Sequence, residues 1–183
     1  LADDFCPEVL REIIDALAGL HGHDQFVGNR LGLPGGADEA RGVLFLAAHM
    51  GHWELLAIVH GFLKIGPLNI VARLLDNPYL DQRINAIRCR SGTKLIYKDR
   101  AASQILRALK HNEMAGILLD QNTSQGHVFV NFFGHPAATN KAIATFALAT
   151  GAPILSAFCL PLPDGRYRLH CGPEIEYQVS DDR

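Results

Sequence analysis

Residues 43–56, VLFLAAHMGHWELL, decide how this chain folds. The first six are uncharged and mostly apolar, which predicts a buried strand over Val43–Ala48. Gly51 then allows a tight turn, and the apolar residues beyond it recur at helical spacing. His49 is therefore expected at the carboxyl end of a strand, and Glu54 in the first turn of a helix. This is where α/β proteins usually carry their chemistry.

The pair His49 and Glu54 is the first candidate for chemistry. We expect Glu54 to lie close enough to reach back to the imidazole, and a histidine held by a carboxylate has a fixed tautomer and orientation. Such a histidine serves as a general base, because neutral imidazole is available near its ordinary pKa of about 6.5. A simpler interpretation is that Glu54 complements the helix dipole and His49 is only a polar residue at a strand end.

Length and composition fit one ordinary globular domain. The chain has 183 residues, of which 48% are hydrophobic and 20% charged, and its formal net charge is −2. We therefore expect residues 1–183 to form a single domain with a substantial core. The small negative charge excludes the strong positive field that would indicate nucleic acid as a partner. No C-x-x-C pair occurs, so free thiols in a reducing compartment are expected at Cys6, Cys89, Cys159 and Cys171.

Outward from the opening stretch, apolar runs alternate between strand-like and helical spacing. This alternation predicts an α/β fold with a mainly parallel sheet covered by helices on both faces. Asn77 and Pro78 predict a helix start, with Asn77 as the N-cap. The predicted helices cover Cys6–Leu20, Trp53–Leu63, Pro78–Arg90, Arg100–Lys110 and a segment capped by Thr139 or Asn140 that ends near Thr150. The predicted strands cover Val43–Ala48, Leu68–Ala72, Lys94–Tyr97, Met114–Leu119, His127–Phe133, Pro153–Leu160 and Tyr167–Cys171, the last two paired through the turn at 163–165.

One uncharged segment, Ala142–Pro163, is long enough to be considered as a membrane span. Gly151 and several prolines interrupt it, which a spanning helix would not favour. A helix, a glycine cap and a buried strand explain the same residues better.

Three predicted strands end in chemically useful side chains. His49 follows the first, Arg73 follows the second, and Asp120 with Gln121 follows a later one. The carboxyl ends of parallel strands meet at one edge of a sheet, so these groups could share a crevice. The alternatives are that Arg73 only forms an ion pair with Asp76, and that Asp120 only caps a loop.

Five segments form an ordered set across the chain. HMGHWE at residues 49–54 has the pattern H-x4-E, and it is followed by RLLDNPYLD at 73–81, ILLDQ at 117–121, VFVNFFGHPA at 128–137 and TGAPI at 150–154. Together they resemble the bacterial lipid A biosynthesis acyltransferases of the lysophospholipid acyltransferase superfamily. H-x4-E alone is a weak signal, whereas the ordered set, which spans roughly residues 26–177, is specific.

The resemblance implies a glycerol-3-phosphate acyltransferase-like α/β fold and an O-acyltransferase activity. Family members move a fatty acyl chain, usually from acyl carrier protein, to a hydroxyl of a lipid acceptor at the cytoplasmic face of the bacterial inner membrane. His49 would remove the proton from the acceptor hydroxyl, and Glu54 would orient His49 and stabilise the imidazolium. No covalent acyl-enzyme is needed, which fits a sequence without a G-x-S-x-G elbow.

The resemblance also implies substrate-binding residues. Arg73 would hold a phosphate of the acceptor or of the carrier's prosthetic arm, for which a planar guanidinium is suited. Candidate oxyanion donors are backbone N–H groups near Gly51 or beside the turn at 132–134. No metal is implied, and no cofactor beyond the acyl carrier protein or coenzyme A thioester as co-substrate. The other positions carried over from the family are Asn77, Asp120, Gln121, Phe133 and Gly134.

Two features depart from the family pattern. His52 stands where the family commonly has asparagine. The usual N-terminal hydrophobic anchor is not seen, so the chain either lost it by truncation or never had it, and without it membrane association would rest on surface patches. Because the sequence starts at Leu1 and not at Met, we expect a fragment of a longer protein. His127 and His135 flank the FFG segment and are further candidates for lining the site.

Other functions stay open at this point. A metal-dependent hydrolase would use His49, His52, Glu54 and Asp120 as ligands, although this spacing matches no familiar zinc signature. A catalytically silent lipid-binding domain of the same fold is a second alternative. Among acyltransferases, a phospholipid or a phosphatidylinositol mannoside is the nearest alternative acceptor, and the fold does not choose between them.

Overall fold

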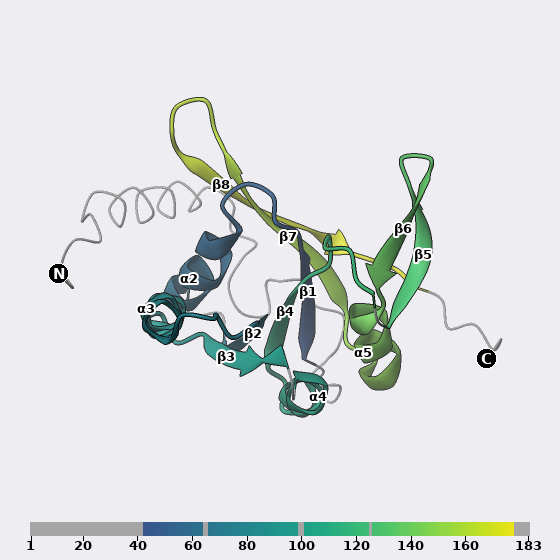
Figure 1. Ribbon diagram of the computed structural model, residues 1–183, viewed down its shortest axis with the longest axis horizontal. Helices are drawn as coiled ribbons and strands as arrows, with labels where there is room; N and C mark the ends of the chain where they lie inside the picture. Colours follow the sequence, from purple (N-terminus) through teal and green to yellow (C-terminus); the bar gives the residue numbers. More distant parts are fainter. Residues whose placement is uncertain (1–41, 64–65, 99–100, 125, 178–183) are drawn as a thin grey trace.

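The computed structural model describes residues 42–63, 66–98, 101–124 and 126–177, and its centre is a six-stranded sheet (Figure 1). The strand order is β3-β2-β4-β1-β7-β8. Five strands are parallel to one another, and β8 alone runs antiparallel, against β7. The strands are β1 (Val43–Ala47), β2 (Leu68–Ala72), β3 (Lys94–Tyr97), β4 (Met114–Leu118), β7 (Ile154–Pro161) and β8 (Tyr167–Glu174). The predicted helix over Cys6–Leu20 lies outside the described residues.

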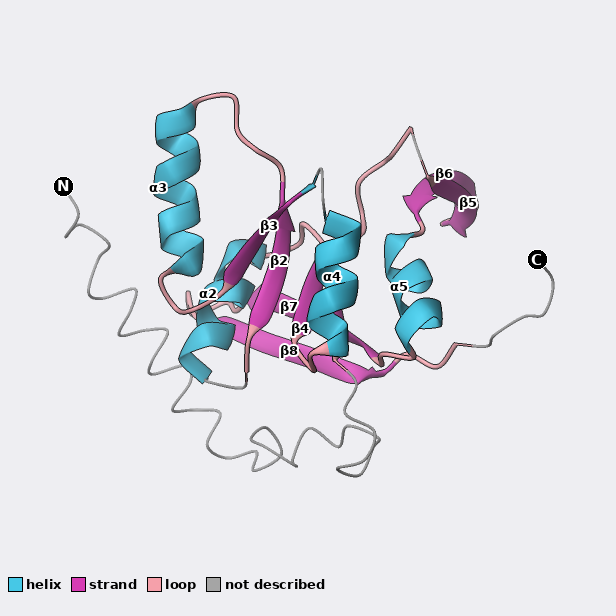
Figure 2. Ribbon diagram, turned by 90° about the horizontal axis from the view of Figure 1, so that it is seen from below, coloured by secondary structure: helices cyan, strands magenta, loops and turns pink. Residues whose placement is uncertain are grey.

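Helices cover both faces of this sheet, as predicted (Figure 2). The helices are α2 (Trp53–Leu63), α3 (Pro78–Cys89), α4 (Ala101–Lys110) and α5 (Ala142–Thr150). Helices α2 and α3 pack together on one face, and α4 and α5 pack together on the other.

The position of β1 in the sheet explains why its sequence is a continuous apolar run. Successive side chains of a strand point to opposite faces, so both faces of a doubly covered sheet need apolar residues. Leu44 is fully buried with Ile105 of α4 and Ala147 of α5. Its neighbour Val43 instead packs in the core that contains Ala57 of α2.

The uncharged segment Ala142–Pro163 forms helix α5 and strand β7, joined at Gly151. Gly151 adopts a left-handed conformation with φ of 68°, and its N–H donates to the Ala147 carbonyl, which is the expected glycine cap. The prediction of a helix, a cap and a strand is confirmed. None of the helices in the described part of the chain is long and apolar enough to cross a membrane.

A second, two-stranded sheet was only half predicted. The strand β5 (His127–Phe132) was expected, but β6 (His135–Asn140) was not, because Pro136 and the small residues after it read as a loop leading to a helix cap. Pairing with β5 makes this segment a strand. Helix α5 then begins at Ala142, whose N–H donates to Asn140 Oδ1 at 2.8 Å. The three described cysteines, Cys89, Cys159 and Cys171, are free.

Candidate active site

His49 and Asp120 meet because β1 and β4 are neighbours in the sheet. In their parallel register Ala47 lies beside Leu118, so the residues two positions further along each strand also lie side by side. His49 Nδ1 is 2.8 Å from Asp120 Oδ1, and the His49 backbone N–H donates to Asp120 Oδ2 at 2.8 Å. Both side chains stay partly exposed, at 29% for His49 and 39% for Asp120, so solvent or a substrate can reach the pair.

The hydrogen bond at Nδ1 fixes the protonation pattern of the imidazole. An ionised carboxylate can only accept hydrogen bonds, so Nδ1 of the neutral His49 ring must carry the proton. The other nitrogen, Nε2, is then the basic atom. The ring also contacts Trp53 edge-on, with centroids 4.9 Å apart, which further limits its rotation. This arrangement is that of an oriented general base.

Asp120 is held in its ionised form by the same contacts. Partial burial by itself would raise the pKa of Asp120, but the hydrogen bonds from the His49 ring and backbone outweigh it, and the pKa lies below its ordinary value of 3.8. The negative charge is therefore present at neutral pH. It would stabilise an imidazolium formed on His49 when the ring accepts a proton.

The turn between β1 and α2 depends on Gly51. Its φ is 64°, a conformation that favours glycine, and a Cβ at this position would collide with the Cys159 carbonyl oxygen. The same carbonyl accepts a hydrogen bond from the His52 N–H at 2.9 Å. The turn is thus fastened to strand β7, and this contact fixes how His49 leaves the sheet.

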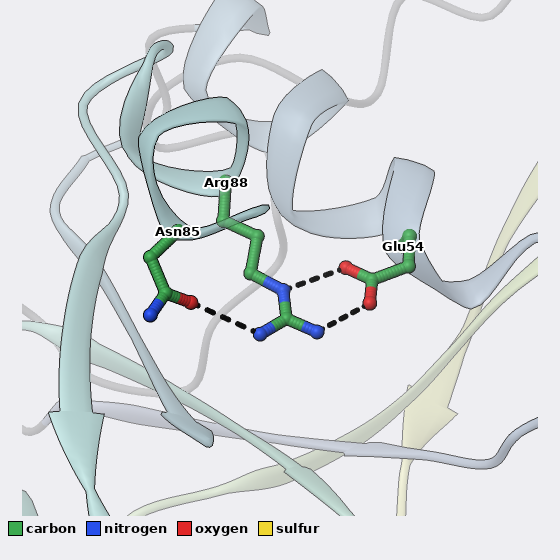
Figure 3. A network of polar contacts seen from close by, with 3 residues as sticks. All are labelled: Glu54, Asn85 and Arg88. Atoms are coloured by element: carbon green, nitrogen blue, oxygen red, sulfur yellow. Dashed lines mark hydrogen bonds and ion pairs between the residues drawn. The ribbon is translucent and has the colours of Figure 1, made fainter. Parts of the chain in front are cut away.

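The Glu54 carboxylate is bound to α3, and not to the His49 ring as its spacing predicted. Its carboxylate binds the guanidinium of Arg88 on α3 in a two-pronged ion pair, with Arg88 Nε donating to Oε2 at 2.9 Å and the second amino group donating to Oε1 (Figure 3). The carboxylate on the imidazole is Asp120. The physical reason is that the first turn of α2 points Glu54 toward α3, where Arg88 offers a matching fork.

Arg88 continues into a buried polar network on α3. Arg88 donates to Asn85 Oδ1 at 3.2 Å (Figure 3). Asn85 in turn donates to Asp81 Oδ2 at 2.9 Å. Asp81, only 7% exposed, also accepts from the Leu75 N–H at 3.0 Å and from the Tyr97 hydroxyl at 3.2 Å. The network therefore joins the Glu54 end of α2 to the loop that follows β2.

Sequence reasoning did not single out Asp81, Asn85 or Arg88 as site residues. A signal was present, because positions 81, 85 and 88 have the i, i+4, i+7 spacing of one helix face. A pocket of about 680 Å³, lined mainly by apolar atoms, lies beside this network. Its lining includes Leu74, Leu75, Asp81, Asn85, Cys89 and Tyr97. This lining does not include His49 or Asp120.

Arg73 and Asn77 lie on the loop beyond β2. Strand β4 separates β2 from β1, so the end of β2 lies about 10 Å from the end of β1. The Arg73 side chain is 77% exposed, and its guanidinium lies 3.3 Å from a carboxylate oxygen of Asp76. This ion pair is the simpler of the two interpretations of Arg73 given above. Asn77 is the N-cap of α3, as predicted, since its Oδ1 accepts from the Tyr79 and Leu80 N–H groups.

The remaining predicted positions lie outside the His49–Asp120 contact. Gln121 is exposed immediately after Asp120, while Phe133 and Gly134 form the tip of the β5–β6 hairpin. Two of the expected oxyanion donors are already engaged. The Gly134 N–H donates to Asn131 Oδ1, and the His52 N–H donates to Cys159.

The four suggested metal ligands do not gather in one place. The His52 ring packs edge-on against Tyr167, with centroids 5.3 Å apart, and Glu54 is bound to Arg88. Within residues 42–177, apart from the few positions left undescribed, no group of three or more His, Cys, Asp or Glu side chains is arranged to hold a metal ion. The geometry favours proton transfer by His49 over ligation by these four residues.

The fold and the site together define an α/β protein with a carboxylate-oriented histidine at the carboxyl edge of its parallel sheet. The family model described as bacterial lipid A biosynthesis acyltransferase matches residues 35–183. The chain belongs to this family, and its predicted class as an acyltransferase is supported accordingly. Among curated proteins, the search found no match to this sequence.

Proposed function

We propose that this chain transfers a fatty acyl group from the thioester of acyl carrier protein, or of coenzyme A, to a hydroxyl of a lipid A precursor or a related glycolipid. Family membership supports acyl transfer as the reaction class. The observation that carries the mechanism is the pair of hydrogen bonds between His49 and Asp120. The proposed setting is the cytoplasmic face of the bacterial inner membrane, where the acyl carrier and the lipid acceptor can meet.

The proposed chemical step uses Nε2 of His49 as the base. Nε2 takes the proton of the acceptor hydroxyl while the hydroxyl oxygen attacks the thioester carbonyl carbon. The tetrahedral intermediate then collapses, the carbon–sulfur bond breaks, and the leaving thiolate takes the proton back from the imidazolium. The products are the acyl ester and the free thiol of the carrier, so no redox partner or covalent acyl-enzyme is required.

Asp120 is the proposed positioning residue for this base. It holds the Nδ1–H tautomer through one carboxylate oxygen and fixes the His49 backbone through the other. Its charge offsets the positive imidazolium that forms during proton transfer. This replaces the mechanism expected from the H-x4-E spacing, in which Glu54 held the ring.

Glu54 is proposed to support catalysis indirectly, without contacting the His49 ring. Its ion pair with Arg88 ties the first turn of α2 to α3, and so keeps the turn that carries His49 in place. We retain Arg73 as the proposed phosphate contact, because its exposed pairing with Asp76 is weak enough to be exchanged for a phosphate. Asn77, Gln121, Phe133 and Gly134 stay proposals as substrate-binding residues.

The test measures acyl transfer to a panel of lipid acceptors. The donor is acyl carrier protein that bears a radiolabelled acyl chain. The panel contains a lipid A precursor, a phospholipid and a phosphatidylinositol mannoside, and wild type is assayed beside His49→Ala, Asp120→Ala and Glu54→Ala. We expect labelling of the lipid A precursor and a loss of about two to four orders of magnitude for His49→Ala. Labelling that survives in His49→Ala would overturn the proposed base, and wild type that labels none of the acceptors would favour a silent lipid-binding domain.

A further inference from the structure

The β5–β6 hairpin exposes apolar side chains on both of its faces. Along β5, Val128, Val130 and Phe132 share one face, while Phe129 lies on the opposite face. Phe133 follows in the turn. Phe129 is 70% exposed, Phe132 63% and Phe133 88%, and the two valines are also exposed. A single flat protein surface can cover only one face of a two-stranded ribbon. An apolar medium that surrounds the tip can cover both.

The turn of the hairpin presents its aromatic rings at the extreme end. Phe132 pairs with His135, so the turn consists of Phe133 and Gly134 alone. Their φ values are 49° and 83°, as a tight two-residue hairpin turn requires, although phenylalanine is an unfavourable residue for the first of them. The Phe132 and Phe133 rings meet edge-on with centroids 4.7 Å apart. The chain thus keeps a large apolar residue where sterics and solvent both disfavour it.

The charge of this region also favours a lipid surface. Between Asp120 and Asp164 the sequence has a single charged residue, Lys141, if the histidines are counted as neutral. Lys141 is exposed and directly follows β6, at the base of the hairpin. An uncharged tip with a cation at its base matches the layers of an anionic bilayer, whose apolar interior lies beneath negatively charged headgroups.

The hairpin extends toward the side of the sheet that bears the candidate active site. The carboxyl ends of β1 and β4 point to the upper side in Figure 1, and the β5–β6 hairpin rises toward the same side. A protein held to a membrane by this tip would therefore turn the edge with His49 and Asp120 toward the lipid. That orientation suits an acceptor that stays in the bilayer.

We propose that the β5–β6 hairpin inserts its tip, centred on Phe132 and Phe133, into the interfacial layer of an anionic lipid bilayer. Insertion is shallow, because the outer edges of a two-stranded ribbon keep unpaired backbone groups that need water. The proposal rests on the proposed function only in assuming a membrane-resident acceptor. An acyl carrier protein is a less suitable occupant, since carriers are acidic and the tip offers no cation.

The test measures binding of the chain to vesicles of phosphatidylethanolamine and phosphatidylglycerol by co-sedimentation. Wild type is compared with Phe132→Ser/Phe133→Ser and with Leu148→Ser, a matched control because Leu148 is an equally apolar residue, 55% exposed on α5. We expect the double variant to bind about tenfold more weakly or worse, and the control to bind like wild type. The Lys141→Gln variant should lose only the part of vesicle binding that weakens when salt is added.

A second measurement locates the tip directly. The chain has one tryptophan, Trp53, so Phe133→Trp and Leu148→Trp are compared with wild type for quenching by bromine-labelled lipids. Extra quenching is expected only in Phe133→Trp. Equal sedimentation of wild type and the double variant would overturn the proposal, as would a double variant that loses binding to acyl carrier protein but keeps binding to vesicles. Vesicle binding is scored without acyl transfer, so it can hold or fail independently of the proposed reaction.

Discussion

Asp120 accepts two hydrogen bonds from one residue, His49, with one at each carboxylate oxygen and both at 2.8 Å. The pairing holds the ring and the backbone of His49 together. It also requires a group with two acceptor oxygens, which only a carboxylate supplies at this position.

Replacing Asp120 by Asn should therefore damage catalysis although the side chain keeps its shape. The amide has one oxygen, so its NH2 group must face either the His49 backbone N–H or the protonated Nδ1. We expect kcat to fall by roughly two to four orders of magnitude, with a much smaller change in KM. Steady-state kinetics measure this, and Asp76→Asn, 95% exposed in its pair with Arg73, is the control expected to keep wild-type kcat.

The Glu54–Arg88 pair should behave as one unit. We expect Glu54→Ala and Arg88→Ala to cause similar losses of stability, and the double variant to be little worse than either, with a coupling free energy of about 1–2 kcal/mol. Urea unfolding of the four proteins gives this number. The exposed pair Asp164–Arg166 is the control, for which we expect coupling below about 1 kcal/mol. Additive losses at 54 and 88 would show that Glu54 acts through another contact.

Gly51→Ala should be costly for two separate reasons. The positive φ strains any side chain, and the new Cβ collides with the Cys159 carbonyl oxygen. Gly92→Ala is a matched control, because Gly92 has φ of 95° but no atom within 4 Å of the added Cβ. Strain alone should lower the free energy of unfolding by about 1–3 kcal/mol in both variants. Gly51→Ala should lose more, and should also lose acyl transfer; equal effects in the two variants would contradict the collision.

Asp81 should matter for stability far more than an exposed acid does. Asp81→Leu leaves the Leu75 N–H, the Asn85 amide and the Tyr97 hydroxyl without their acceptor. We expect a loss of about 1–3 kcal/mol in the free energy of unfolding. Because Leu75 lies on the loop that carries Arg73, the KM for a phosphate-bearing acceptor should rise as well. An unchanged KM would mean that this loop does not contact the acceptor.

His60 should make the protein less stable in mild acid. It is 8% exposed, neither ring nitrogen has a hydrogen-bond partner among the described residues, and burial lowers its pKa below the ordinary value of 6.5. The unfolded chain therefore binds a proton more readily than the folded protein, so the stability is present above pH 6.5 and falls as the pH drops below it. His60→Leu should raise stability and flatten this dependence, while His170→Gln, at an exposed site on β8, should not.

Most of the fold could be predicted because its signals are local. Leu68–Ala72 and Lys94–Tyr97 match the predicted strands to the residue, and Trp53–Leu63 matches the predicted helix. The period of apolar residues depends only on the residues within one element. The strand β6 was missed because its residues have weak strand propensity, and its structure comes from pairing with β5.

Local sequence patterns were enough to predict the α/β class, the family, and the position of His49 and Asp120 at the ends of two strands. They did not determine which carboxylate holds the imidazole. Glu54 is five residues from His49, whereas Asp120 is 71 residues away, yet Asp120 makes the contact. Two packing relationships in the fold set these contacts. The parallel register of β1 and β4 brings Asp120 beside His49, and the packing of α2 against α3 places Arg88 beside Glu54. Both are long-range contacts, which no local pattern encodes.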